Sequence, residues 1–162
     1  MGDWNAMVVR VPASSPIAQT LTNLRLVAVA FRVGDVHWEV GASGVLNAFF
    51  STISGRLEPD GVGTRFPTLM RHLYTGSLNA DLAEPAIREL ANAREELRAF
   101  PPEQVIWDLE DPAALPPWGV NISADIADLA SYFVTSDGLD LITVLHDALA
   151  ASQHSGQPIR IE

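Results

Sequence analysis

The sequence predicts a single α+β domain in which a small, mostly antiparallel sheet packs against about four helices. Its length of 162 residues, with 48% apolar and 19% charged residues, suits one compact hydrophobic core. Strand and helix patterns are mixed without the regular alternation that builds a parallel sheet. There is no cysteine, so a disulfide scaffold is excluded and only histidine and carboxylate chemistry remains for a site.

The first strands are expected directly after an irregular N-terminal stretch. Prolines and serines interrupt residues 1–23, which we expect to be an N-terminal extension or edge strand, whereas residues 24–162 form the domain. Apolar and polar residues alternate over residues 24–40 on both sides of Gly34-Asp35. This pattern is typical of a β-hairpin with a tight turn.

Helical spacing of apolar residues predicts three helices in the middle of the chain, over residues 45–53, 66–73 and 82–99. Gly55 is expected to end the first helix, and residues 58–63, rich in turn formers, are expected to be a surface loop. Asp81 and Glu84 have the spacing of a capping box at the start of the third helix.

The last third of the chain combines short strands, one loop and one helix. The predicted elements are a buried strand at 104–107, an ordered loop at 108–119, a short helix or turn leading into a strand over 121–135, a helix over 139–155, and an edge strand at 158–162. Ser136-Asp137-Gly138 is expected to cap that helix, and Gly156 to end it.

The net charge of −10 is concentrated in one third of the chain. Residues 1–98 contain ten acidic residues and nine arginines, a net charge of −1, whereas residues 99–159 contain nine acidic residues and no cation, a net charge of −9. Such a segment repels phosphate backbones, which argues against nucleic-acid binding. It attracts a basic protein or a metal ion, or it serves only as a solvated face.

The sequence gives no indication of a membrane or export segment. The longest apolar run, Leu26–Phe31, has the length of a strand, and Asp3 stands where a secretory signal would carry positive charge. We therefore expect a protein that stays in the cytoplasm and has no membrane partner.

Patterns for catalysis and cofactor binding are weak. The four histidines never lie one helical turn apart, Gly41–Gly44 lacks the spacing of a hydrolase elbow, and Gly61–Gly63 lacks the context of a phosphate-binding loop. The sequence therefore predicts no catalytic residue, no cofactor and no metal site, and a catalytically silent protein.

The ordered loop at 108–119, called the acidic loop below, contains the one cluster of side chains that could bind a ligand or take part in catalysis. Its carboxylates could chelate a hard cation, act as an acid or base, bind a partner, or simply hold the turns of their own loop. Trp118 is either a packing anchor under this loop or an exposed aromatic contact. We select as candidate partner-binding residues Asp108, Glu110, Asp111, Trp118, Asp137 and Asp140.

Six short motifs, all within residues 63–138, give the sequence a family resemblance. They are Gly63-Thr64-Arg65-Phe66-Pro67, Leu73-Tyr74-Thr75-Gly76, Phe100-Pro101-Pro102, Trp107-Asp108-Leu109-Glu110-Asp111-Pro112, Pro116-Pro117-Trp118-Gly119 and Tyr132-Phe133-Val134-Thr135-Ser136-Asp137-Gly138. From about Val27 to the C-terminus, the chain resembles the bacterial immunity proteins of polymorphic toxin systems of the kind called immunity protein 70.

The resemblance implies a non-enzymatic α+β protein that neutralises a toxin and protects the producing cell and its kin. An acidic surface suits a basic toxin such as a nuclease, and we expect a monomer or weak homodimer. Two alternatives stay open. One is a metal-assisted hydrolase built on the Asp108 loop, and the other is a non-catalytic structural or regulatory domain.

Overall fold

The computed structural model describes residues 28–111, 113–116 and 122–162. Its strands form one antiparallel sheet in the order β2-β1-β4-β3. They are β1 (Ala28–Val33), β2 (Val36–Ala42), β3 (Ser77–Leu78) and β4 (Ile159–Ile161). The predicted α+β class, with a small antiparallel sheet and packed helices, is confirmed.

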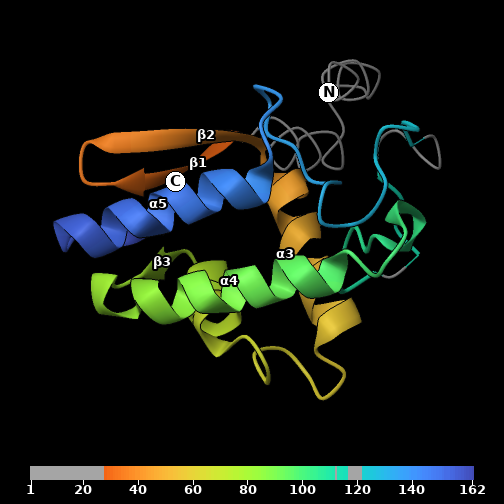
Figure 1. Cartoon of the computed structure of the whole chain (residues 1–162), viewed down its shortest axis with the longest axis horizontal. Coiled ribbons are helices and arrows are strands. Elements are labelled where there is room, and N and C mark those ends of the chain that lie inside the picture. The colour runs from red at the N-terminus through yellow and green to blue at the C-terminus, as the bar shows by residue number, and fades with distance from the viewer. Residues whose placement is uncertain (1–27, 112, 117–121) are drawn as a thin grey trace, which may run out of the picture.

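Three α-helices among the described residues accompany the sheet, namely α3 (Ser43–Leu57), α4 (Ala83–Leu97) and α5 (Leu141–Ser155). α4 and α5 pack against each other, and α5 also covers β1 and β2 (Figure 1). Shorter helical turns connect these elements: the π-helix η1 (Thr68–His72) and the 3-10 helices η2 (Leu73–Thr75), η3 (Ala80–Leu82) and η4 (Pro102–Gln104). None of the described helices is long and apolar enough to cross a bilayer.

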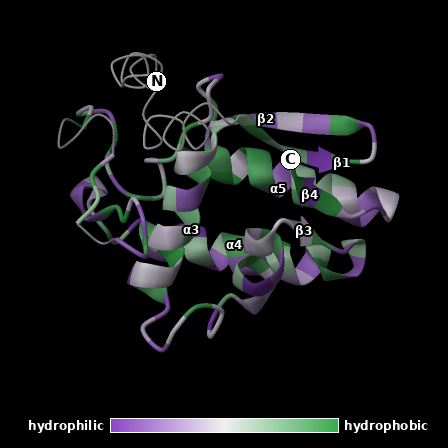
Figure 2. Ribbon diagram, turned by 180° about the vertical axis from the view of Figure 1, so that it is seen from behind, coloured by the Kyte–Doolittle hydropathy of each residue, from purple (hydrophilic) through white to green (hydrophobic). Residues whose placement is uncertain are grey.

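The hydrophobic core lies where the helices meet the sheet. Hydrophobic residues alternate with hydrophilic ones along α4 and α5, as amphipathic helices require (Figure 2). Phe49 of α3 packs against Phe50 and Phe133, with ring centroids 5.5 and 5.3 Å apart. The predicted apolar face of the second helix is confirmed, because all four of its members are buried: Phe66, Leu69, Met70 and Leu73.

The β-hairpin is confirmed, and its turn depends on glycine. Gly34 has φ +59°, a left-handed conformation that suits the first central position of a two-residue hairpin turn. The register pairs Phe31 with Trp38 and shifts at a β-bulge near Val40.

The C-terminal strand is present, but the prediction that it lies at a sheet edge is wrong. β4 pairs with β1 on one side and β3 on the other. Beyond its end, Ala30 and Glu162 exchange two backbone hydrogen bonds of 2.7 and 2.9 Å. The alternation of side chains shows that a segment is a strand, whereas its place in the sheet depends on segments distant in sequence.

Two predictions about helix ends, the stop of α3 at Gly55 and the capping box of α4, are also wrong. α3 continues through Gly55, since tertiary contacts along the whole helix outweigh the propensity cost of about 1 kcal/mol for one glycine. The capping box of α4 is not formed, because the 3-10 turn η3 takes up Asp81 and leaves Leu82 at the N-cap without a side-chain hydrogen bond.

Three predictions for the C-terminal third need correction. The segment at 104–107 is not a strand: Gln104 belongs to the 3-10 turn η4, and the backbone of Ile106 bonds to the Thr52 side chain of α3. The described part of 121–135 consists of turns, with one isolated bridge between Val134 and Asp140. The N-cap of α5 is Asp140 rather than the turn at 136–138. Gly156 does end α5, with φ +75°.

Candidate partner-binding surface

The acidic loop begins with a segment that is fixed to α3. Thr52, which is fully buried, donates a 3.2 Å hydrogen bond from Oγ1 to the Ile106 carbonyl and accepts a 3.0 Å bond from the Ile106 N–H. Ser51 Oγ accepts from the Leu109 N–H at 3.1 Å. Two hydroxyl groups of α3 thus provide the backbone hydrogen bonds that a neighbouring strand would otherwise provide.

A glycine makes this close approach possible. A Cβ on Gly55 would overlap Ile106 Cδ1, so the isoleucine occupies the space that a side chain would need. Arg56, the next residue, donates from Nε to the Gln104 carbonyl at 2.8 Å. α3 therefore supplies three successive attachment points, through Ser51 and Thr52, Gly55, and Arg56.

The carboxylates of the loop have different surroundings. Asp108 is half-buried, and its Oδ1 accepts from the Glu110 N–H at 3.0 Å, so it holds the turn of its own loop. Glu110 and Asp111 are exposed, and within the described ranges their side chains have no hydrogen bond or ion pair. These two carboxylates are available to an external partner.

Asp140 has a structural task at the start of α5. Its carboxylate accepts from the Thr143 N–H at 3.0 Å and from the Thr143 hydroxyl at 2.7 Å, which caps the helix. It also accepts from Arg94 Nη2 at 3.0 Å and so ties α5 to α4. Asp137 lies exposed in the preceding turn, where Ser136 donates to the Val40 carbonyl.

The structure groups the candidate residues into two places. Asp108, Glu110 and Asp111 lie on the segment attached to Ser51, in the third turn of α3. The turn that carries Asp137 is attached to the end of β2, just before α3 begins, about 12 Å away along the helix axis. Figure 1 shows the two loops apart, one beyond the end of α4 and the other beside the start of α5. Trp118 lies outside the described residues.

A buried carboxylate, Glu58, organises the loop that precedes η1. Only 3% of Glu58 is exposed. It accepts backbone N–H bonds from Gly63, Arg65 and Phe66 at 3.0 to 3.1 Å. The sequence analysis placed this residue in a surface loop and missed its role. The available signal was a carboxylate followed by one proline and two glycines, Pro59, Gly61 and Gly63, a turn-forming composition in which backbone N–H groups have no helix or strand partner.

A second pair of contacts fastens the same loop to α4. Arg65 donates to both oxygens of Glu96, at 2.6 and 2.7 Å, and these hydrogen bonds raise the pKa of Arg65 above its ordinary value. Glu89 accepts from the backbone N–H groups of Thr68 and Leu69. The loop and the start of η1 are thereby held by three carboxylates.

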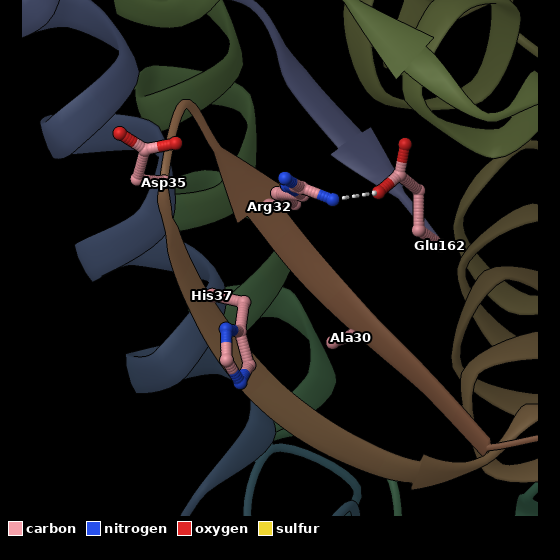
Figure 3. Close-up of a pocket in the computed structure, with 5 residues that line it drawn as sticks. All are labelled: Ala30, Arg32, Asp35, His37 and Glu162. Carbon is pink, nitrogen blue, oxygen red and sulfur yellow. Dashed lines mark hydrogen bonds and ion pairs between the residues drawn. The ribbon is translucent and has the colours of Figure 1, made fainter.

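The sheet face opposite α5 carries a shallow hollow of about 260 Å³ (Figure 3). It is lined by Ala30, Arg32, Asp35, His37 and Glu162. Arg32 pairs with Glu162 at 3.2 Å, and none of these five side chains offers a hydroxyl nucleophile. Across the part of the chain that the structure covers, no three histidine or carboxylate groups are arranged to hold a metal ion.

Comparison with known proteins gives one match. The family model described as Immunity protein 70 matches residues 31–161, which is most of the chain. Searches of curated proteins and of solved structures give no match.

Proposed function

Since the chain belongs to the immunity protein 70 family, we propose that it binds and neutralises a cognate toxin by presenting the acidic segment at 105–111 to a basic surface of that toxin. The observation that carries the proposal is the contrast between a rigid backbone and free carboxylates. Thr52 and Ser51 fix the segment, whereas Glu110 and Asp111 remain exposed. A preorganised contact loses little conformational entropy on binding.

The charge distribution supports this choice of surface. Residues 99–159 hold nine acidic residues and no cation, so this part of the chain contributes a negative field. Such a field speeds the approach of a basic partner and disfavours acidic ones. A nuclease is a suitable toxin, because a protein that binds nucleic acid carries a basic cleft.

The proposal includes the other expectations for this chain. Residues 24–162 form one domain, with residues 1–23 as an N-terminal extension or edge strand. The protein is not an enzyme and acts by binding in the cytoplasm. Asp108, Trp118, Asp137 and Asp140 are further partner-binding candidates. Asp108 and Asp140 are the weaker choices, because their carboxylates already hold a turn and a helix start.

Growth rescue and association kinetics with the cognate toxin test the proposal. The double variant Glu110→Gln/Asp111→Asn should slow association several-fold at low salt, because the steering charge is lost. The difference in association rate between the double variant and the wild type should become smaller near physiological ionic strength, where charges are screened over about 8 Å.

The matched control removes the same charge elsewhere. Asp81→Asn/Glu84→Gln lies at the opposite end of α4, where both carboxylates are exposed. This control should associate like the wild type. Full rescue and unaltered low-salt association for the Glu110/Asp111 variant would show that the toxin binds elsewhere.

A further inference from the structure

The turn at 135–139 has a backbone that hydrogen bonds hold in place. Thr135, which is 1% exposed, donates its N–H to the Leu139 carbonyl at 2.8 Å and accepts from the Leu139 N–H through Oγ1 at 3.1 Å. The Gly138 N–H donates to the Thr135 carbonyl at 2.9 Å. One buried threonine therefore fixes both backbone groups of Leu139.

The turn is also attached to three neighbouring elements. The Ser136 N–H donates to the Val40 carbonyl of β2 at 3.0 Å. A Cβ on Gly41 would lie 3.0 Å from Ser136 Cβ, so the turn packs closely on the end of the strand. Directly after the turn, Asp140 caps α5 and pairs with Arg94 of α4. The turn is therefore held in one position relative to β2, α4 and α5.

Leu139 is the apolar tip of this turn. It is 54% exposed, whereas Leu141, two residues later, is fully buried in the core. Because both backbone groups of Leu139 are bonded to Thr135, the direction of its Cα–Cβ bond is fixed, and the side chain cannot turn inward without breaking those bonds. Figure 1 shows the turn projecting from the body of the molecule beside the start of α5. Single exposed leucines are common on proteins, but a leucine on a fixed, projecting backbone is preorganised for contact.

A free carboxylate lies next to this tip. Asp137 is exposed, and its side chain has no hydrogen bond or ion pair with any residue that the structure describes. Asp140, on the other side of Leu139, is already occupied by Arg94 and Thr143. An apolar side chain with one free carboxylate beside it complements an apolar pocket that has an arginine or lysine at its rim.

We propose that Leu139 is an apolar anchor for the cognate toxin and inserts into such a pocket, with Asp137 facing the basic group at the rim. This inference rests on the proposed function. The turn and the segment at 105–111 are attached to the fold at points about 12 Å apart along α3. An interface of standard size covers about 800 Å² of each partner, so one toxin surface is wide enough to contact both.

The anchor and the carboxylates should act on different rate constants. Burial of Leu139 is a short-range apolar contact that salt does not screen, so it should slow dissociation of the complex. The charges of Glu110, Asp111 and Asp137 act over a distance and should speed association at low salt. The two contributions can therefore be measured separately.

Dissociation kinetics of the complex with the cognate toxin test the anchor. Leu139→Ala should speed dissociation about tenfold at low and at physiological salt, and should change the association rate by less than about twofold. Leu139→Met keeps the apolar volume and should stay within about threefold of the wild type. Asp137→Asn should instead slow association, and only at low salt.

Val36→Ala is the matched control. Val36 is 56% exposed and lies at the opposite end of β2 from the turn, so its truncation should leave both rates unchanged. Thermal unfolding of Leu139→Ala should match the wild type within about 2 °C, because the removed methyl groups are largely in solvent. Faster dissociation then reflects a lost contact with the toxin and not a damaged turn.

The outcomes separate this inference from the proposed function. A wild-type protein that does not bind the toxin would overturn the proposed function, and the anchor with it. A complex that Leu139→Ala leaves as long-lived as the wild type would overturn the anchor alone. Sedimentation without toxin adds a third outcome: a dimer that Leu139→Ala disrupts would place Leu139 in a contact between two copies of the chain and would also overturn the anchor.

Discussion

Two loops pack near the C-terminal half of α3, and they use carboxylates in opposite ways. The loop at 58–66 folds around Glu58, which is 3% exposed and accepts three backbone N–H bonds. The segment at 105–111 is held by hydroxyl groups of α3 and leaves Glu110 and Asp111 in solvent. Whether a carboxylate is used by the fold or left in solvent therefore depends on which groups satisfy the neighbouring backbone.

The energetic reason is desolvation. A buried carboxylate is tolerated only when hydrogen-bond donors replace its hydration shell, and Glu58 obtains three such donors from a loop whose N–H groups would otherwise be unsatisfied. The segment at 105–111 has no such need, because Thr52 and Ser51 bind its backbone directly. Two of its three carboxylates, those of Glu110 and Asp111, remain in solvent.

Disrupting the loop at 58–66 should have the largest effect on stability. Glu58→Gln keeps the shape but removes the charge, and it turns an –NH₂ group toward backbone donors. We expect a loss of about 3 kcal/mol in the free energy of unfolding, measured by denaturant titration. Asp60→Asn, an exposed substitution in the same loop, should change it by less than about 0.5 kcal/mol. Equal effects of the two substitutions would contradict the assigned role of Glu58.

Weakening the attachment of residues 105–111 to α3 should lower the free energy of unfolding by a smaller amount. Gly55→Ala forces a Cβ against Ile106 Cδ1, and this overpacking, of about 2 kcal/mol, exceeds the gain of about 1 kcal/mol from helix propensity. The net loss of unfolding free energy should therefore be about 1 kcal/mol. Adding Ile106→Ala to Gly55→Ala should cost less than Ile106→Ala does alone, because the added methyl then fills space. If the loss of unfolding free energy in the double variant equals the sum of the two single losses, the contact between Gly55 and Ile106 does not determine how the segment packs on α3.

The sequence predicted elements well where the signal is local. Alternation around Gly34-Asp35 gave the hairpin, and apolar spacing identified the regions of α3, η1, α4 and α5. The segment at 104–107 was mistaken for a buried strand because apolar extended residues have the same composition whether they pair with a strand or with helix side chains, and its residues are only half-buried or exposed. The family resemblance, confirmed by the match over residues 31–161, came from motifs rather than from any physical signature of binding.

The candidate site was less predictable for a physical reason. Clustering in sequence located Asp108, Glu110 and Asp111 but could not show that Asp108 is bonded to its own loop. Any of the three carboxylates could have held a turn of the loop, and the side chain that does so is that of Asp108. Local turn geometry decides which of them takes this role, and composition does not encode it.

The smallest effect on stability should come from the free carboxylates of the second loop. Glu110→Gln/Asp111→Asn should change the unfolding free energy by no more than about 0.5 kcal/mol, because neither side chain has a bonding partner within the described residues. Asp108→Ala should lose about 1 kcal/mol, because the Glu110 N–H then loses its acceptor. Thermal and denaturant unfolding of the two variants measure this difference. A double variant as destabilised as Asp108→Ala would mean that Glu110 or Asp111 also holds the fold, and slower toxin association could then no longer be assigned to lost charge alone.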